Sequence, residues 1–245
     1  MTSNKVALVT GANKGLGLAA SRHLAQQGIT VLMGSRNAAK GKAAVKLLQQ
    51  EGLAVEFIQI DVTKSEQIRK AAAEIKKRFG KLDILVNNAG MVSKEEPLVS
   101  NSAGEIKPRE LRKVFDANFF GLVEVTQALL PLIKKSGSGN IVNISSILGS
   151  LALQSKDSEM AAFKPFAYDA SKTAVNAFTV HLAAALKDTT IKVNSAHPGW
   201  VRTDMGGPQA PIMPEEGAKT AVRLATLGPD GPTGKFYYGD DELPW

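Results

Sequence analysis

The chain has short apolar runs, rich in valine, isoleucine and leucine, that alternate with longer amphipathic segments. The runs have the length and composition of buried strands and cover residues 6–10, 30–33, 54–60, 84–87, 141–145 and 191–196. The segments with helical spacing of apolar residues are 16–27, 38–50, 65–79, 119–134 and 170–187. Strands that alternate with helices are joined by right-handed crossovers. The pattern predicts an α/β fold with a doubly wound parallel sheet of about seven strands and helices on both faces.

No flexible linker divides the sequence, because its glycine and proline clusters fall at the ends of predicted elements. A chain of 245 residues with 44% hydrophobic content can form one core, so we expect a single domain over 1–245 whose cofactor half spans about 1–145. Three irregular segments, 91–108, 151–167 and 198–214, each follow a predicted strand. Ligands of open α/β sheets bind beyond the carboxyl ends of the strands, so we expect these loops to surround a substrate.

Charge and composition exclude several classes of function. Lysine and arginine outnumber aspartate and glutamate by 30 to 23, but they are dispersed rather than gathered in a tail or stripe, so we expect no nucleic-acid partner. The absence of cysteine excludes disulfides, thiolate metal sites and cysteine nucleophiles. The first apolar run is too short for a signal peptide or a membrane span, so we expect a cytoplasmic protein with no membrane partner. His23, His181 and His197 have no metal-ligand spacing, and no metal is expected.

The segment from Thr10 to Gly17, with the sequence TGANKGLG, lies between the first predicted strand and the first predicted helix. Glycine permits a tight turn and close approach of the backbone to a pyrophosphate, and the helix start supplies unpaired N–H groups. We interpret the segment as the phosphate site of a Rossmann fold rather than as a simple turn. The residues expected to form it are Gly11, Asn13, Lys14, Gly15, Leu16 and Gly17.

The residues after the second predicted strand indicate which dinucleotide binds. An acidic residue about 20 positions past the glycines binds the adenosine ribose in NADH sites, but this sequence has Ser35 and Arg36 there. A guanidinium and a hydroxyl, helped by Lys14, suit the additional 2′-phosphate of NADPH or NADP+. The alternative is that Arg36 is an ordinary surface residue at the start of the next helix.

Six motifs together resemble the short-chain dehydrogenase/reductase family, and the resemblance runs from Lys5 to the carboxyl terminus. In chain order they are Thr10 to Gly17, Asp61, Asn87-Asn88-Ala89-Gly90, Asn118, Ser145-Ser146 and Tyr168-Asp169-Ala170-Ser171-Lys172. Within the family, the stretches 118–121, 198–205 and 214–218 are similar to NADPH-dependent carbonyl reductases. Besides the glycine segment, the resemblance implies cofactor contacts from Asp61, Val62, Asn88, Ala89, Gly90, Tyr168, Lys172, Pro198, Gly199, Val201 and Thr203.

Tyr168 and Lys172 are four residues apart at the start of a predicted helix, so their side chains share one face. An adjacent ammonium and an oxidised nicotinamide both favour the tyrosine phenolate, which adapts Tyr168 to proton transfer. The resemblance implies that Tyr168 is the general acid that protonates the carbonyl oxygen, and that Lys172 also bonds the nicotinamide ribose. It implies that Ser146, with Ser145 as the alternative, donates a hydrogen bond to this oxygen. It implies that Asn118, which begins or kinks a helix, holds a water linked to Lys172; an ordinary helix cap is the alternative.

The substrate is a small-molecule carbonyl compound on this interpretation. Ser146 and Tyr168 would contact it, and Trp200 and Met205 would add an apolar wall, with Met91, Met160, Phe163 and Phe166 as further members or as packing residues. The leading hypothesis is an NADPH-dependent reductase of apolar aldehydes, ketones or quinones. The alternatives are a reductase of one acyl-carrier, steroid or terpenoid ketone, and a non-catalytic NADPH-sensing module. The segment between Ser146 and Tyr168 is longer than in most relatives, which leaves monomer and homo-oligomer both open.

Overall fold

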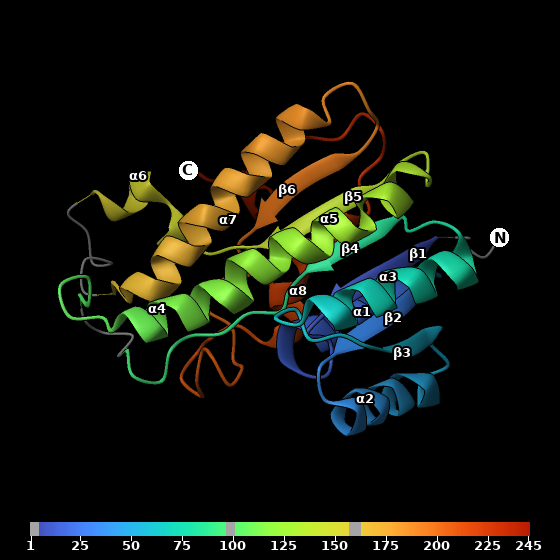
Figure 1. The fold of residues 1–245 in the computed structure, drawn as a ribbon, viewed down its shortest axis with the longest axis horizontal. Helices are drawn as coiled ribbons and strands as arrows, with labels where there is room; N and C mark the ends of the chain where they lie inside the picture. The colour runs from blue at the N-terminus through green and yellow to red at the C-terminus, as the bar shows by residue number, and fades with distance from the viewer. Residues whose placement is uncertain (1–4, 97–100, 157–162) are drawn as a thin grey trace.

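The computed structural model describes residues 5–96, 101–156 and 163–245, in which one sheet is covered by helices on both faces (Figure 1). The strands are β1 (Val6–Thr10), β2 (Thr30–Ser35), β3 (Val55–Gln59), β4 (Ile84–Asn87), β5 (Asn140–Ile144), β6 (Lys192–Ala196), β7 (Lys235–Tyr238) and β8 (Asp241–Glu242). Their spatial order is β3-β2-β1-β4-β5-β6-β7-β8. All pairs are parallel except β7 with β8. The predicted doubly wound sheet is confirmed, with one short antiparallel strand added at its edge.

The helices form two layers because side chains alternate along each buried strand. Ala7 and Val9 pack toward α1 (Gly15–Gln26), α2 (Ala38–Gln50) and α8 (Pro214–Ala225). Val6 and Leu8 pack toward α3 (Ser65–Phe79), α5 (Gly121–Lys134) and α7 (Phe166–Ala185), the layer at the front of Figure 1. Both faces of the central strands are therefore buried, as a parallel sheet requires.

Several elements differ from the sequence-based expectation. The helix expected from residue 119 is preceded by α4 (Pro108–Phe115) and the π-helical segment η1 (Asp116–Phe120). Among the eight residues of α4, only Glu110 and Val114 are buried, so its apolar stripe is too thin to identify from sequence. The expected loop after β5 contains the 3₁₀ turn η2 (Ile147–Gly149) and α6 (Leu151–Gln154), and α7 starts at Phe166 rather than at 170. Tyr168 therefore lies in the first turn of α7, directly after Pro165, where a proline is compatible with a helix start.

The carboxyl ends of the central strands meet at one edge of the sheet. Asn87 of β4 lies level with Asn143 of β5, and Ile144 lies level with Ala196 of β6. Strands β2 and β3 lie on one side of β1, and β4 and the later strands lie on the other side. The strand order therefore reverses between β1 and β4, and open α/β sheets bind their ligands at such a point. The loops after β1, β4, β5 and β6 consequently converge on one region. None of the helices in the described ranges is long and apolar enough to cross a bilayer.

Candidate active site

The loop after β1 has the backbone geometry of an anion cradle. Gly11 and Gly15 have φ angles of +67° and +54°, in the left-handed region that favours glycine. A Cβ on Gly17 would lie 2.5 Å from both Gly11 O and Asn88 Nδ2, so a side chain does not fit there. Lys14 precedes α1 and makes no side-chain cap. The first N–H groups of α1, around Leu16, are thus available to a phosphate, and the chain fits a dinucleotide at this place.

The turn after β4 supports this loop from behind. Asn88 Nδ2 donates to Thr10 O at 2.8 Å and to Gly11 O at 3.3 Å. Thr10 Oγ1 accepts from the backbone N of Asn88 and of Ala89, each at 3.0 Å. A Cβ on Gly90 would lie 3.3 Å from Asn118 Oδ1 and 3.8 Å from Lys172 Nζ. The turn therefore joins the phosphate loop to the predicted catalytic residues.

The end of β2 carries the basic group expected to choose the cofactor. Ser35 is buried, and its hydroxyl donates to Asn13 Oδ1 at 3.3 Å. Arg36 is exposed and forms no ion pair within the described part of the chain. Lys14, in contrast, is paired with Asp204 of the loop after β6. Arg36 is therefore a cation at this end of the site that has no carboxylate within ion-pair distance among the described residues.

The turn after β3 is held by its own aspartate. Asp61 Oδ1 accepts from Thr63 N at 3.0 Å and from Thr63 Oγ1 at 2.8 Å. The carbonyl group of Val62 lies against Gly121, so closely that a Cβ on Gly121 would collide with it. The turn is thereby fixed against the start of α5, next to the segment that holds Asn118.

The loop after β6 folds back over the phosphate loop. Gly199 has a φ of +81°, and Arg202 N donates to Ile212 O at 2.8 Å, which brings the end of this loop back beside Val201. A Cβ on Gly15 would lie 3.1 Å from Thr203 Cγ2. On the other side, the carbonyl oxygen of Pro198 lies against α8, 3.1 Å from where a Cβ on Gly217 would be. This loop is positioned to cover a bound dinucleotide.

The two expected substrate contacts on this loop differ in exposure. The indole of Trp200 is 55% exposed, and its Nε1 donates to Gly206 O at 2.8 Å. Met205 is half-buried. Phe166 lines a cavity of about 390 Å³ together with Asp169 and Thr173 of α7, and neither Trp200 nor Met205 is among its lining residues. Met160 lies outside the described residues.

Tyr168 and Lys172 lie together at the start of α7. Lys172 is buried, its Nζ donates to Ile144 O at 2.7 Å, and it lies 5.6 Å from the centre of the Tyr168 ring. Desolvation lowers the pKa of Lys172 to about 8. Burial raises the pKa of Tyr168 to about 12, against a hydrogen bond with Ser146 that lowers it. The tyrosine is therefore a neutral phenol at pH 7, the form that can donate a proton.

The two serines after β5 point to different places. Ser145 Oγ donates to Asn176 Oδ1 at 2.6 Å, inside the packing between β5 and α7. Ser146 is hydrogen-bonded to Tyr168, and its Oγ also accepts from Leu148 N at 3.2 Å. Ser146 is thus the serine that shares a site with the tyrosine.

Asn118 lies within the π-helical segment and is fully buried. Its Oδ1 accepts from Met91 N at 2.7 Å, and its Nδ2 donates to Met91 O at 2.9 Å and to Ser171 Oγ at 3.0 Å. The segment lies inside a continuous helical stretch from α4 to α5, so Asn118 does not begin a helix but lies where the α-helical pattern is interrupted. The Asn118 side chain fastens the loop after β4 to α7.

Sequence reasoning assigned no role to several buried polar groups near this site. His197, at the end of β6, is buried, and its Nδ1 has no partner among the described residues. Desolvation lowers the pKa of His197 to about 4. Glu96 and Ser102 contact the start of α7 from the loop after β4. These contacts join positions up to 71 residues apart, and no local sequence pattern signals them. No cluster of possible metal ligands is present in the described ranges.

Comparisons with known proteins identify relatives that share the sequence pattern and the fold. The family model described as short chain dehydrogenase matches residues 5–212. Carbonyl reductase (NADPH) 1 of Homo sapiens is 38% identical over 94% of this chain and 95% of the human protein. The NADPH-bound carbonyl reductase from chicken fatty liver superposes with a TM-score of 0.85 at 26% identity, over 98% of this chain and 94% of that chain. Salutaridine reductase from Papaver somniferum superposes with a TM-score of 0.81 at 30% identity, over 95% of this chain and 99% of that chain.

Proposed function

The chain belongs to the short-chain dehydrogenase family, and from this premise we propose that it reduces aldehydes, ketones or quinones to alcohols with NADPH as the hydride donor. The observation that carries the proposal is the contact of Tyr168 with Ser146 and Lys172, next to the turn at Gly90 that supports the glycine loop. The human and chicken relatives, both named carbonyl reductases that use or bind NADPH, support the choice of reaction and cofactor.

Each of the three side chains has a distinct role in the proposed reaction. NADPH, when bound along the glycine loop and under the loop after β6, supplies the hydride. Tyr168 donates its phenolic proton to the carbonyl oxygen as negative charge develops there. Ser146 donates a hydrogen bond to the same oxygen. Lys172 holds an ammonium beside the tyrosine ring, which favours the phenolate left behind.

The hydrogen bonds of the Asn118 side chain suit a positioning role in this reaction. Both N–H groups of its amide are used, by Met91 O and by Ser171 Oγ, so a water that resupplies protons would have to contact another atom of the residue. A π-helical segment displaces main-chain groups from the regular helical pattern, and such segments are frequent at functional sites. We therefore assign the water contact to the main chain of Asn118, and the fastening of the Met91 loop to its side chain.

Arg36 is proposed to select NADPH over NADH, because it is exposed at the end of β2 with no carboxylate partner in the described ranges. Replacing it with aspartate removes a charge-assisted bond to the 2′-phosphate and adds repulsion. We expect kcat/KM with NADPH to fall by about 10- to 100-fold, while kcat/KM with NADH stays level or rises. The same charge change at exposed Arg69 is the control for long-range electrostatics. If Arg36→Asp lowered kcat/KM equally with NADPH and with NADH, this assignment would be contradicted.

The pKa of Lys172 predicts how the rate depends on pH. Below about pH 8 the ammonium is charged and assists proton donation by Tyr168, whose own pKa of about 12 keeps it protonated throughout. We therefore expect kcat/KM for reduction to be constant up to about pH 8 and to fall above it as Lys172 loses its proton. A profile that stays flat well past this pKa would show that the Lys172 charge is not needed.

Turnover measurements distinguish this proposal from its rivals. NADPH oxidation is followed by absorbance with a panel of aldehydes, ketones and quinones. Broad turnover supports the leading proposal. The similarity to salutaridine reductase, a protein named for one substrate, favours a second candidate, a reductase dedicated to one metabolite ketone, which turnover of a single acyl-carrier, steroid or terpenoid ketone would support. Tight NADPH binding with no turnover of any carbonyl compound would favour the sensing module instead.

A further inference from the structure

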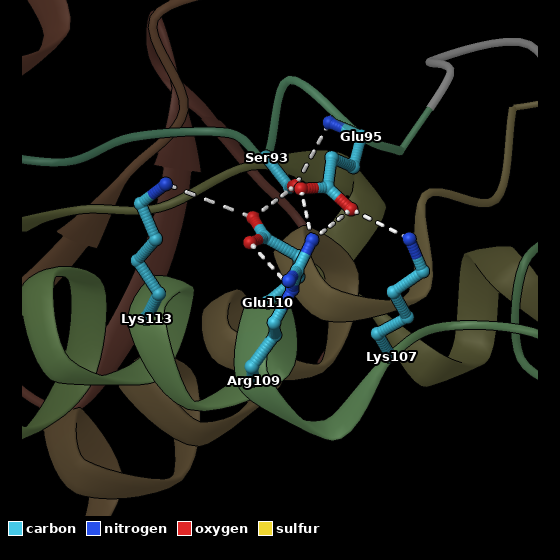
Figure 2. A network of polar contacts seen from close by, with 6 residues as sticks. All are labelled: Ser93, Glu95, Lys107, Arg109, Glu110 and Lys113. Atoms are coloured by element: carbon cyan, nitrogen blue, oxygen red, sulfur yellow. Dashed lines mark hydrogen bonds and ion pairs between the residues drawn. The ribbon is translucent and has the colours of Figure 1, made fainter.

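The segment 91–96, which follows the turn after β4, is clamped against the start of α4 (Figure 2). Ser93 Oγ donates to Glu110 Oε2 at 2.8 Å, and the Glu110 side chain is buried. Glu95 N donates to Ser93 Oγ at 3.1 Å, and the Glu95 carboxylate accepts from Arg109 Nη2 at 2.7 Å and from Lys107 Nζ at 3.0 Å. The segment therefore has a fixed position on the side that faces α4.

The last residue of the segment reaches the start of the helix that carries Tyr168. Glu96 is 4% exposed, and its Oε1 accepts from Ala167 N at 3.0 Å. The same oxygen accepts from Ser102 Oγ, which in turn accepts from Phe166 N at 3.0 Å. Pro165, at the N-cap position, makes no side-chain cap. The first two N–H groups of α7 are thus satisfied by residues far away in the sequence, whereas most helices are capped locally.

We propose that Glu96 is a positioning residue for the reaction, which caps α7 from the 91–96 segment and thereby sets the place of Tyr168. This proposal rests on the role of Tyr168 proposed above. Tyr168 follows Ala167 directly, so a shift of the capped N–H group moves the phenol with it. A carboxylate is also the side chain that the positive end of a helix favours.

A second chain of bonds fixes the same tyrosine from the following turn. Ser171 Oγ donates to Tyr168 O at 2.7 Å and accepts from Asn118 Nδ2, which is itself bonded to Met91 at the beginning of the segment. Both ends of the 91–96 segment are therefore connected to the start of α7 by hydrogen bonds: Glu96 bonds to the residue before Tyr168, and Met91 is linked to Tyr168 through Asn118 and Ser171. The segment acts as a brace that fixes the catalytic helix relative to the turn supporting the glycine loop.

Of the two neighbouring carboxyl groups at the start of α7, those of Glu96 and Asp169, only one needs to be charged. Desolvation, together with the Glu96 charge, raises the pKa of Asp169 to about 8 against the opposing charge of Lys164. Asp169 is thus neutral at pH 7, and Glu96 avoids repulsion by a second carboxylate. One oxygen of each side chain, Glu96 Oε2 and Asp169 Oδ1, has no partner in the described ranges.

The test compares Glu96→Leu with Glu96→Gln, because leucine removes the acceptor and glutamine keeps it. With the carbonyl compound that the wild-type enzyme reduces fastest, we expect Glu96→Leu to lower kcat by about 10- to 100-fold, since misplacement by about 1 Å has effects of this size. Glutamine should restore kcat to within about threefold, and NADPH affinity, measured by fluorescence titration, should change by less than about threefold in both variants. Glu105→Gln, an exposed acid on the same loop, is the matched control.

A double-mutant cycle with Tyr168→Phe separates positioning from general stability. If Glu96 acts through Tyr168, Glu96→Leu has no further effect on kcat once the phenol is gone. Full additivity in this cycle, or wild-type kcat in folded Glu96→Leu, would overturn the proposal. Ser102→Ala, expected to lower kcat by about two- to fivefold through the same link, replaces Glu96→Leu in the cycle if that variant does not fold. Unchanged turnover in Tyr168→Phe alone would instead overturn the proposed function.

Discussion

Replacing Tyr168 with phenylalanine is expected to lower kcat by about 10²- to 10⁴-fold, the usual contribution of a general acid. The phenol is hydrogen-bonded to Ser146 and lies beside the Lys172 ammonium, and its raised pKa keeps it protonated at neutral pH. Phenylalanine preserves the ring next to the Lys172 ammonium, so the start of α7 should keep its packing. NADPH should still bind, because the glycine loop and Arg36 are unchanged.

The measurement is kcat with saturating carbonyl substrate, together with NADPH affinity by fluorescence titration. Tyr237→Phe is the matched control, since it removes a tyrosine hydroxyl from β7, where the ring packs under Arg223. That variant should turn over like the wild type. Loss of NADPH binding in Tyr168→Phe would mean that the residue is structural, and unchanged kcat would mean that another group supplies the proton.

Replacing Ser146 with alanine is expected to lower kcat by about 10²- to 10³-fold, as does removal of other hydrogen bonds to a developing oxyanion. The hydroxyl of Ser146 is bonded to Tyr168, so both groups can contact one carbonyl oxygen. KM should change little, because the bond strengthens mainly as negative charge develops on this oxygen.

Ser145→Ala provides the comparison within the same strand end. Its hydroxyl bonds to Asn176 inside the protein, so its loss should lower the free energy of unfolding by about 1 kcal/mol and leave kcat nearly unchanged. Thermal unfolding and steady-state kinetics measure the two effects separately. A larger loss of kcat in Ser145→Ala than in Ser146→Ala would reverse the assignment of the two serines.

The sheet was predictable because its central strands are buried on both faces. Such strands read as continuous apolar runs, as in β1 and β4, and β1 is followed directly by a helix with apolar residues at helical spacing. Strand β7, with the sequence KFYY, lies near the edge of the sheet beside the two-residue strand β8; only its Phe236 is fully buried, and it was not recognisable as a separate run. A strand needs fewer buried side chains at the edge of a sheet, so its sequence pattern is weaker.

The predicted site residues depended on local motifs, and the contacts between motifs did not follow from them. The glycine loop and the four-residue spacing of Tyr168 and Lys172 were visible in the sequence because each lies within a few consecutive residues. The choice between Ser145 and Ser146 depended on how the end of β5 is rotated, which no residue pattern specifies. Glu96 was missed because it caps α7 across 71 positions, a contact that only the folded chain creates.

The central claim is that hydride passes from NADPH to a carbonyl carbon at this site, and isotope transfer tests it most directly. NADPH in which both hydrogens of the hydride-releasing nicotinamide carbon are replaced by deuterium is incubated with wild-type protein and an aromatic ketone, and the alcohol is analysed by mass spectrometry. We predict one deuterium on the carbinol carbon of the alcohol, and at least about 100-fold less labelled alcohol with Tyr168→Phe over the same time. Alcohol formed without deuterium, or NADPH bound with no alcohol formed from any carbonyl compound, would contradict the account.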